Sequence, residues 1–152
     1  MAPVWAQSGK VGASGLPLPR FVSFRAVEVN LRSGPGVRYP ILWVFQRRGL
    51  PVEIVDEFDT WRQIRDAGGT TGWVHQSMLQ GRRSVLVQGQ GEQILRKQPG
   101  LGAAPVARLE PGVVARLDHC TDENWCRVEV QSFSGWLPRD TFYGTYQNEI
   151  YE

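Results

Sequence analysis

Two cysteines, Cys120 and Cys126, carry the most distinctive chemistry in this sequence. They flank a polar stretch, 121–125, that is typical of the turn of a β-hairpin. Because Cys126 has the same strand parity as Val128, which we expect to face the core, a bond between the two thiols would lie beneath the hairpin. The sequence therefore predicts a disulfide. A metal site that also uses His119 is the alternative, although two thiols and one adjacent imidazole supply three ligands in the wrong geometry.

Neither histidine is well placed for nucleophilic catalysis. His119 directly precedes Cys120, and neighbouring side chains on a strand point to opposite faces, so the imidazole cannot activate the thiol. His75 is expected to be an exposed residue at a strand end. Asp56 and Asp59 lie in an apparent turn, where aspartate is common because its carboxylate accepts backbone hydrogen bonds. We therefore expect no enzymatic activity, no catalytic residues, no metal and no cofactor.

Aromatic and basic residues around the first long loop indicate a binding surface instead. Ile64 is expected to face the core, so Trp61 falls on the opposite face of the same strand. With Tyr39 reaching over from the loop, Trp61 would offer flat apolar area to a peptide stem or a sugar ring. Guanidinium groups can hold carboxylates or phosphates in bidentate fashion. The predicted ligand-binding groove consists of Tyr39, Trp61, Arg32, Arg38 and Arg47, with Arg48 nearby.

Simpler roles for these residues remain open. Trp61 could cover one open end of a small barrel, and the arginines could be solubilising residues of a surface loop. Trp73 and Trp136, each of which follows a glycine in a short strand, are expected in the core. Nucleic acid is not expected as a partner, because acidic residues at 53, 56, 57 and 59 interrupt the basic surface.

The composition is that of a chain able to bury a core. The sequence has 152 residues, 41% of them hydrophobic, with 17 Gly and 10 Pro that indicate frequent turns. The mean hydropathy is −0.30, and no apolar stretch approaches the length needed to cross a bilayer, so no integral membrane segment is expected. Residues 1–85 carry a net charge of +5 and residues 86–152 one of −3. The difference in charge is explained by the solvated faces of two domains or, alternatively, by a basic surface in the first half that meets an anionic partner.

An internal repeat with a period of 64 residues divides the chain into two similar modules. Leu31-Arg32 recurs as Leu95-Arg96, Trp61 recurs as Trp125, and Gly72-Trp73 recurs one residue early as Gly135-Trp136. Within each copy, apolar residues alternate with polar ones, which is typical of half-buried strands. Short strands are expected at 27–32, 50–55, 61–64, 71–74, 112–117, 125–130 and 135–137. The pattern predicts an all-β protein made of two small, bent barrels or sandwiches.

These residues resemble the bacterial SH3 domain family, in two tandem copies that cover nearly all of 25–143. The first copy matches best, through 30–36, 39–41, Gly49, 52–54, 61–64 and 72–74. The resemblance implies two tandem SH3-like β-barrels in an exported bacterial protein, periplasmic or secreted. It also implies a module that binds peptidoglycan or a cell-envelope peptide or protein, often beside a cell-wall hydrolase. The alternatives are an adaptor that docks extended or Pro-containing peptides, and an accessory subunit of a separate hydrolase.

The two ends of the chain suggest its boundaries. Residues 4–7 look like the end of a secretory signal, and 1–19 are expected to be a flexible leader outside the fold. The first barrel is expected over 20–84 and the second over 85–152, with an aromatic tail. That tail is expected to fold back between the barrels or to extend as a strand that a partner could capture.

Overall fold

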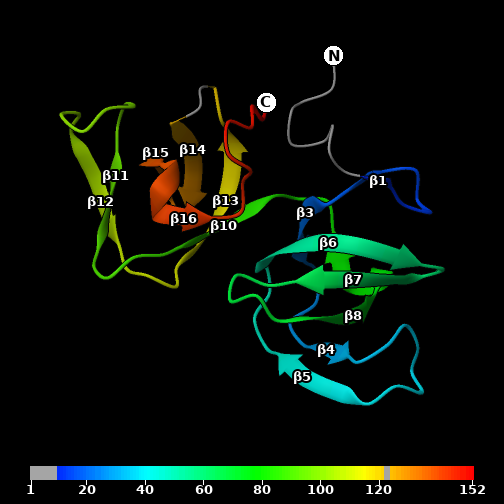
Figure 1. Cartoon of the computed structure of the whole chain (residues 1–152). Helices are drawn as coiled ribbons and strands as arrows, with labels where there is room; N and C mark the ends of the chain where they lie inside the picture. Colours follow the sequence, from blue (N-terminus) through cyan, green and yellow to red (C-terminus); the bar gives the residue numbers. More distant parts are fainter. Residues whose placement is uncertain (1–9, 122–123) are drawn as a thin grey trace. The chain divides into compact units, whose positions relative to one another are not determined.

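The computed structural model describes residues 10–121 and 124–152 and divides the chain into two units, Met1–Arg82 and Arg83–Glu152 (Figure 1). Both units consist of β-strands, with one short 3-10 helix each, η1 (Gln76–Met78) and η2 (Arg139–Thr141). The all-β expectation is confirmed. The division falls at Arg82, two residues before the expected end of the first barrel. No helix in the described part of the chain is long and apolar enough to cross a membrane.

The two units share one strand order, which is the structural counterpart of the sequence repeat. The first sheet runs β5-β4-β8-β7-β6-β3-β9 and the second runs β12-β11-β15-β14-β13-β10-β16, so each strand has a counterpart at the same place. The strands of the first unit are β1 (Lys10–Val11), β2 (Pro17–Leu18), β3 (Arg20–Phe24), β4 (Val29–Arg32), β5 (Ile41–Phe45), β6 (Pro51–Phe58), β7 (Trp61–Arg65), β8 (Thr71–His75) and β9 (Leu79–Gln80). Those of the second are β10 (Ser84–Val87), β11 (Gln93–Arg96), β12 (Pro105–Leu109), β13 (Val114–His119), β14 (Trp125–Val130), β15 (Phe133–Pro138) and β16 (Phe142–Tyr143).

Neither sheet closes into a barrel, which corrects the expectation of two closed barrels. Closure would require the two end strands of a sheet to pair with each other. In the first unit these are β5 and β9, and β9 is two residues long and pairs with β3. In the second unit β12 and β16 are the corresponding ends.

A period of two along the strands builds one core in each unit. Val29 and Leu31 on β4 are fully buried, whereas Asn30 between them is exposed, because successive side chains on a strand point to opposite faces. Ile64 on β7 is buried as expected, and Arg62 shares its face. The first core comprises Leu18, Val22, Phe24, Val29, Leu31, Phe45, Val52, Ile54, Ile64 and Val74. The second comprises Val85, Val87, Leu95, Leu109, Ala115, Leu117, Cys120, Cys126, Val128, Leu137 and Phe142.

The expectation that Trp73 and Trp136 belong to the core is wrong. Both are half-buried, and the residues that follow them, Val74 and Leu137, occupy the core instead. Side-chain alternation then places each tryptophan on the outer face.

The segment expected to be a flexible leader is folded over its described part. Residues 10–11 pair with residues 17–18 as a hairpin, and the Leu18 side chain is 2% exposed within the first core. Ser14, in the turn of this hairpin, donates hydrogen bonds to the Glu57 carboxylate on β6 from its backbone amide and from its hydroxyl, which lies 2.9 Å from both carboxylate oxygens. The expectation for residues 10–19 is therefore corrected, because an apolar side chain and a polar turn both find partners in the sheet. Residues 1–9 lie outside the described residues.

The C-terminal tail folds back onto its own unit. Tyr151 pairs with Cys120, at the end of β13, through two backbone hydrogen bonds. Glu149 is 2% exposed and accepts two hydrogen bonds of 2.9 Å from Arg83, which precedes β10. The tail therefore completes the second unit.

The Cys120–Cys126 disulfide is present, with Cα atoms 4.2 Å apart and both side chains fully buried. We expect its reduction to lower the free energy of unfolding of the second unit by about 2 kcal/mol, because a short loop in the unfolded chain is released. Urea unfolding with and without reductant measures this difference. Two titratable thiols in the denatured, non-reduced protein would contradict the disulfide.

The repeated Gly-Trp pair also has a steric cause that can be tested. A Cβ added to Gly72 would lie 2.6 Å from the Leu31 side chain, and one added to Gly135 would lie 2.6 Å from the Arg96 carbonyl oxygen. We expect Gly72→Ala to lower the free energy of unfolding of the first unit by about 1–3 kcal/mol, because the side chain overpacks the core. Gly68→Ala is the control, since its nearest neighbour is 3.6 Å away. Equal stability of the two variants in urea unfolding would refute this reason for the repeat.

Candidate functional site

A groove of about 190 Å³ lies on the outer face of the first sheet. Arg32 and Asn30 contribute to it from β4, Trp61 from β7 and His75 from β8. These side chains share the outer face because Leu31, Ile64 and Val74 point into the core. The full lining is Glu28, Asn30, Arg32, Val37, Trp61, His75 and Met78.

Trp61 is held by an aromatic contact across the sheet. It pairs in register with His75, and the two rings meet edge to face with centroids 5.3 Å apart. The Nδ1 atom of His75 lies 2.7 Å from the Ser77 hydroxyl and accepts a hydrogen bond from the Ser77 backbone amide. His75 is thus a half-buried wall of the groove and not the exposed strand end that the sequence predicted. Its pairing with Trp61 could have been found from the hairpin register alone.

Arg32 lines the groove and also braces the loop beside it. Its Nη1 atom donates hydrogen bonds of 3.0 Å to the carbonyl oxygens of Val37 and Tyr39. The second unit repeats this arrangement, since Nη1 of Arg96 donates to the Ala103 carbonyl oxygen at 2.8 Å. The guanidinium of Arg32 is therefore a positive charge held in one position in the groove wall.

The other predicted groove residues, Tyr39, Arg38 and Arg47, are not among its lining residues. The Tyr39 ring packs on the loop backbone, where a Cβ on Gly34 would lie 2.5 Å from the ring. The Arg38 guanidinium lies 5.2 Å from the centre of that ring and donates a hydrogen bond to the Tyr39 hydroxyl. Arg47 is exposed beyond the end of β5. The structure thus brings Trp61 and Arg32 together in one groove and adds Val37, His75 and Met78 to its lining. Tyr39 instead packs against the loop backbone at Gly34.

A second groove, of about 370 Å³, occupies the matching place in the second unit. Trp125 lies where the first unit has Trp61, Leu101 where it has Val37 and Pro138 where it has His75. Pro138 pairs with Trp125 where His75 pairs with Trp61, so a proline ring stands in place of the imidazole that faces Trp61. Asn124, Arg139 and Asp140 complete the lining.

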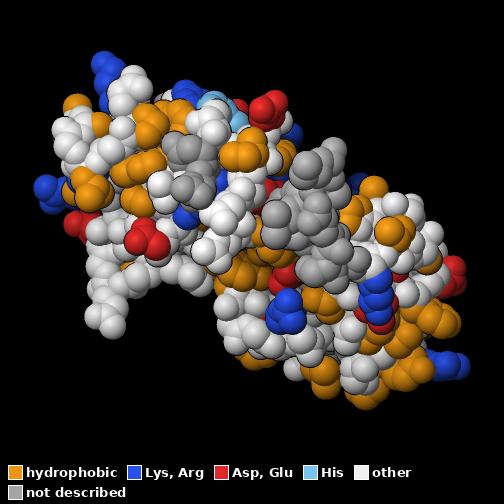
Figure 2. Space-filling view, turned by 45° about the horizontal axis from the view of Figure 1, so that its top comes forward, with side chains coloured by type: hydrophobic (Ala, Val, Ile, Leu, Met, Phe, Trp, Pro, Cys, Tyr) orange, Lys and Arg blue, Asp and Glu red, His pale blue; other side chains and the backbone are white. Residues whose placement is uncertain are grey.

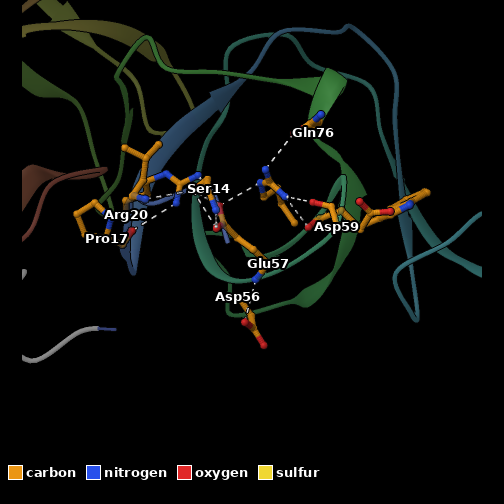
Figure 3. A network of polar contacts seen from close by, with 10 residues as sticks. Ser14, Pro17, Arg20, Asp56, Glu57, Asp59 and Gln76 are labelled. Carbon is orange, nitrogen blue, oxygen red and sulfur yellow. Dashed lines mark hydrogen bonds and ion pairs between the residues drawn. The ribbon is translucent and has the colours of Figure 1, made fainter. Parts of the chain in front are cut away.

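A buried carboxylate holds the turn that leads into Trp61 (Figure 3). Glu57 has a fully buried side chain, and its Oε2 lies 2.8 Å from Nη2 of Arg20 and 3.1 Å from Nε of Arg62. Arg62 in turn donates hydrogen bonds to the carbonyl oxygens of Asp59 and Trp61 and to the Gln76 side chain. The network therefore holds the backbone of Trp61 and of the turn that precedes it.

The same network keeps Glu57 ionised. Burial alone would raise the pKa of the carboxyl group. Hydrogen bonds from the backbone of Ser14 and from the side chains of Arg20 and Ser14, together with the charge of Arg20, outweigh burial and hold the pKa below its usual 4.5. Glu57 thus remains negative between two arginines.

In the second unit the disulfide takes the place of this ion pair. Glu57 pairs with Arg62 in the register of β6 and β7. In the counterpart hairpin, His119 pairs with Arg127, so the next cross-strand position is that of Cys120 and Cys126. One position in the fold is therefore joined by charge in one copy and by a covalent bond in the other.

Comparison with known proteins identifies relatives of both units. A family model described as "Bacterial SH3 domain" matches residues 25–81 and 89–143. The chain is 26% identical over 120 residues to "Putative N-acetylmuramoyl-L-alanine amidase YrvJ" of Bacillus subtilis (strain 168). The matched region covers 72% of this chain and 23% of that protein. The chain thus spans about a quarter of the length of this curated relative.

Two solved structures resemble the chain weakly. NlpC1 from Trichomonas vaginalis matches with a TM-score of 0.38 and 11% identity, over 97% of this chain and 51% of that one. NlpC2 from the same organism matches with a TM-score of 0.37 and 10% identity, over 85% of this chain and 48% of that one.

The Glu57 network makes stability depend on acid pH in a defined direction. Because the pKa of Glu57 is lower in the folded than in the unfolded chain, its stabilisation is complete above about pH 4.5 and is lost as the pH falls through the lowered pKa. We expect Glu57→Gln to cost about 3 kcal/mol at neutral pH, because Arg20 and Arg62 lose their counter-charge, and to flatten the acid part of the profile. Urea unfolding of the first unit at several pH values measures both effects.

Asp56→Asn is the matched control for this experiment. Asp56 is partly exposed, and its pair with Lys10 spans 3.9 Å, so its loss is expected to cost less than about 1 kcal/mol. An unchanged acid profile in Glu57→Gln would show that the carboxylate does not set this pH dependence.

Proposed function

Since the chain belongs to the bacterial SH3 domain family, we propose that it is a non-enzymatic binding module that recognises peptidoglycan or a cell-envelope peptide through its first unit. The family expected from the sequence is confirmed over both copies. The observation that carries the proposal is the groove of the first unit, in which Trp61, held edge to face against His75, lies in one lining with the fixed charge of Arg32.

The chemistry of this groove suits a cell-wall fragment. An indole face beside Val37 and Met78 provides apolar area for a sugar ring or for the aliphatic part of a stem peptide. Arg32 provides a cation for a carboxylate of the same ligand. Because its Nη1 is already held by two carbonyl oxygens, little side-chain freedom is lost when a ligand binds.

Two observations support a role beside a hydrolase and outside the cytoplasm. The curated relative is named as an amidase, and the chain matches 23% of its length. Both cysteines are consumed by a disulfide, a bond that persists in oxidising compartments. We therefore place the chain in the bacterial envelope, periplasmic or secreted, as an accessory module of a cell-wall hydrolase.

The proposal can be tested by co-sedimentation of the protein with isolated peptidoglycan sacculi at low salt and at about 0.3 M salt, which screens loose charge attraction. We expect salt-resistant pelleting that Trp61→Ala abolishes, while the free energy of unfolding changes by no more than about 1 kcal/mol because the side chain lies on the outer face. A large loss of stability would assign Trp61 a structural role.

Trp125→Ala is the matched control in the second unit. We expect it to pellet like the original protein, because Pro138 stands in the second groove where the first has His75. Loss of pelleting in Trp125→Ala alone would move the binding site to the second unit. Protein that stays in the supernatant under all conditions would refute the cell-wall proposal and favour an adaptor for extended or Pro-containing peptides.

A further inference from the structure

The end strand β5 of the first sheet exposes three consecutive apolar residues. Ile41 is 46% exposed, Leu42 57% and Trp43 59%. Figure 2 shows hydrophobic side chains gathered at the lower right, over the first unit. Burial of such surface would be favourable, and contiguous exposed apolar residues mark interaction sites in proteins that stay in solution.

The geometry of β5 leaves both its faces and one edge uncovered. Trp43 pairs with the fully buried Leu31 on the core side of the sheet, yet Trp43 itself remains 59% exposed. Ile41 pairs with Arg32, after a bulge, on the outer side. β5 ends the strand order, so within the described residues its second edge has no strand partner.

The counterpart strand β12 shows that the fold does not require this surface. Both strands anchor in their cores through the last residue, Phe45 in β5 and Leu109 in β12. Where β5 has Ile41, Leu42, Trp43 and Val44, β12 has Pro105, Val106, Ala107 and Arg108. Proline and charged residues on an end strand are devices that prevent another strand from adding to it. The second unit has both devices, and β5 has neither.

The charges around β5 indicate what kind of strand could add there. Arg38 precedes the strand, and Arg47 and Arg48 follow it. On the neighbouring strand β4, the acidic residue nearest to β5 in the pairing register is Glu28. It lies one position before Val29, which pairs with Phe45. An antiparallel pairing of two copies centred on Trp43 would place Arg38 of one copy opposite Arg48 of the other, which like-charge repulsion disfavours. A strand with acidic ends would instead find an arginine near each end.

We propose that β5 is a docking edge for an extended segment of a partner protein that has alternating apolar residues in its middle and acidic residues at both ends. The segment adds to the sheet as an eighth strand through backbone hydrogen bonds, and its apolar side chains cover Trp43 on one face and Ile41 on the other. None of Ile41, Leu42 and Trp43 belongs to the lining of the Trp61 groove, although Ile41 pairs with Arg32 of that lining, and the proposal does not depend on what the groove binds.

The test is a selection of nine-residue peptides displayed on phage, against the whole oxidised protein. A matched variant transfers the β12 residues to β5: Ile41→Pro, Leu42→Val and Trp43→Ala. We expect peptides that alternate apolar residues between acidic ends to be enriched on the original protein. A synthetic copy of the best peptide should bind the variant more than about tenfold more weakly, because a central aromatic anchor is lost.

A second variant remains informative if the triple variant fails to fold. Arg48→Glu changes one exposed side chain. It should weaken the acidic-ended peptide and strengthen a version of the same peptide with lysine ends. Trp61→Ala should bind the peptide unchanged, and the triple variant should still pellet with sacculi, so the docking edge and the groove can fail independently.

Three results would overturn the docking edge. These are the absence of enriched peptides, enriched peptides that bind the original protein and the triple variant equally, and a preference for lysine-ended peptides on the original protein. A concentration-dependent dimer in sedimentation velocity that the triple variant abolishes would instead show that the edge pairs with a second copy of the chain.

Discussion

The buried carboxylate of Glu57 is the interaction on which the first unit depends. It connects the N-terminal hairpin through Ser14, β3 through Arg20 and β7 through Arg62. An ion taken out of water is costly unless its hydrogen bonds and counter-charges are complete. Here they are complete only when all three elements are in place, so the carboxylate makes the hairpin, the sheet and the turn before Trp61 mutually dependent.

The second unit satisfies the same constraint by other means. Where the first unit joins β6 to β7 by charge, the second joins β13 to β14 by the Cys120–Cys126 bond. Each unit also covers this region with a terminal segment: the hairpin of residues 10–18 contacts Glu57, and the tail pairs at Cys120. Arg83 and Glu149, a buried pair, anchor that tail. Both units thus have a cross-strand connection at this position and a terminal segment that contacts it. The connection is an ion pair in the first unit and a disulfide in the second.

The two copies differ most where the fold demands least. Their cores and their Gly-Trp positions match, because Gly72 and Gly135 face the same close contacts. The exposed and half-buried positions do not match: His75 is replaced by Pro138, Tyr39 by Ala103 and the residues Ile41, Leu42 and Trp43 of β5 by Pro105, Val106 and Ala107. Differences that leave the core intact are where binding roles can diverge, and in the first unit they produce an aromatic groove and an unprotected strand edge.

The sequence by itself determined the two modules, the strands β4, β6, β7, β8, β13, β14 and β15, the inward face of Ile64 and the Cys120–Cys126 bond, because alternation and hairpin register are local properties of the chain. Tertiary structure alone decided that Leu18 enters the core, that Glu57 gathers two arginines and a serine, and that Glu149 binds Arg83. Apart from Arg62, which faces Glu57 across the β6–β7 hairpin, the partners in these ion pairs and hydrogen bonds lie 37 to 66 residues apart in the chain. No local sequence pattern links residues so distant. They pair because the folded sheet buries these charged groups, and a buried charge is costly unless it has a counter-charge or a hydrogen-bond partner.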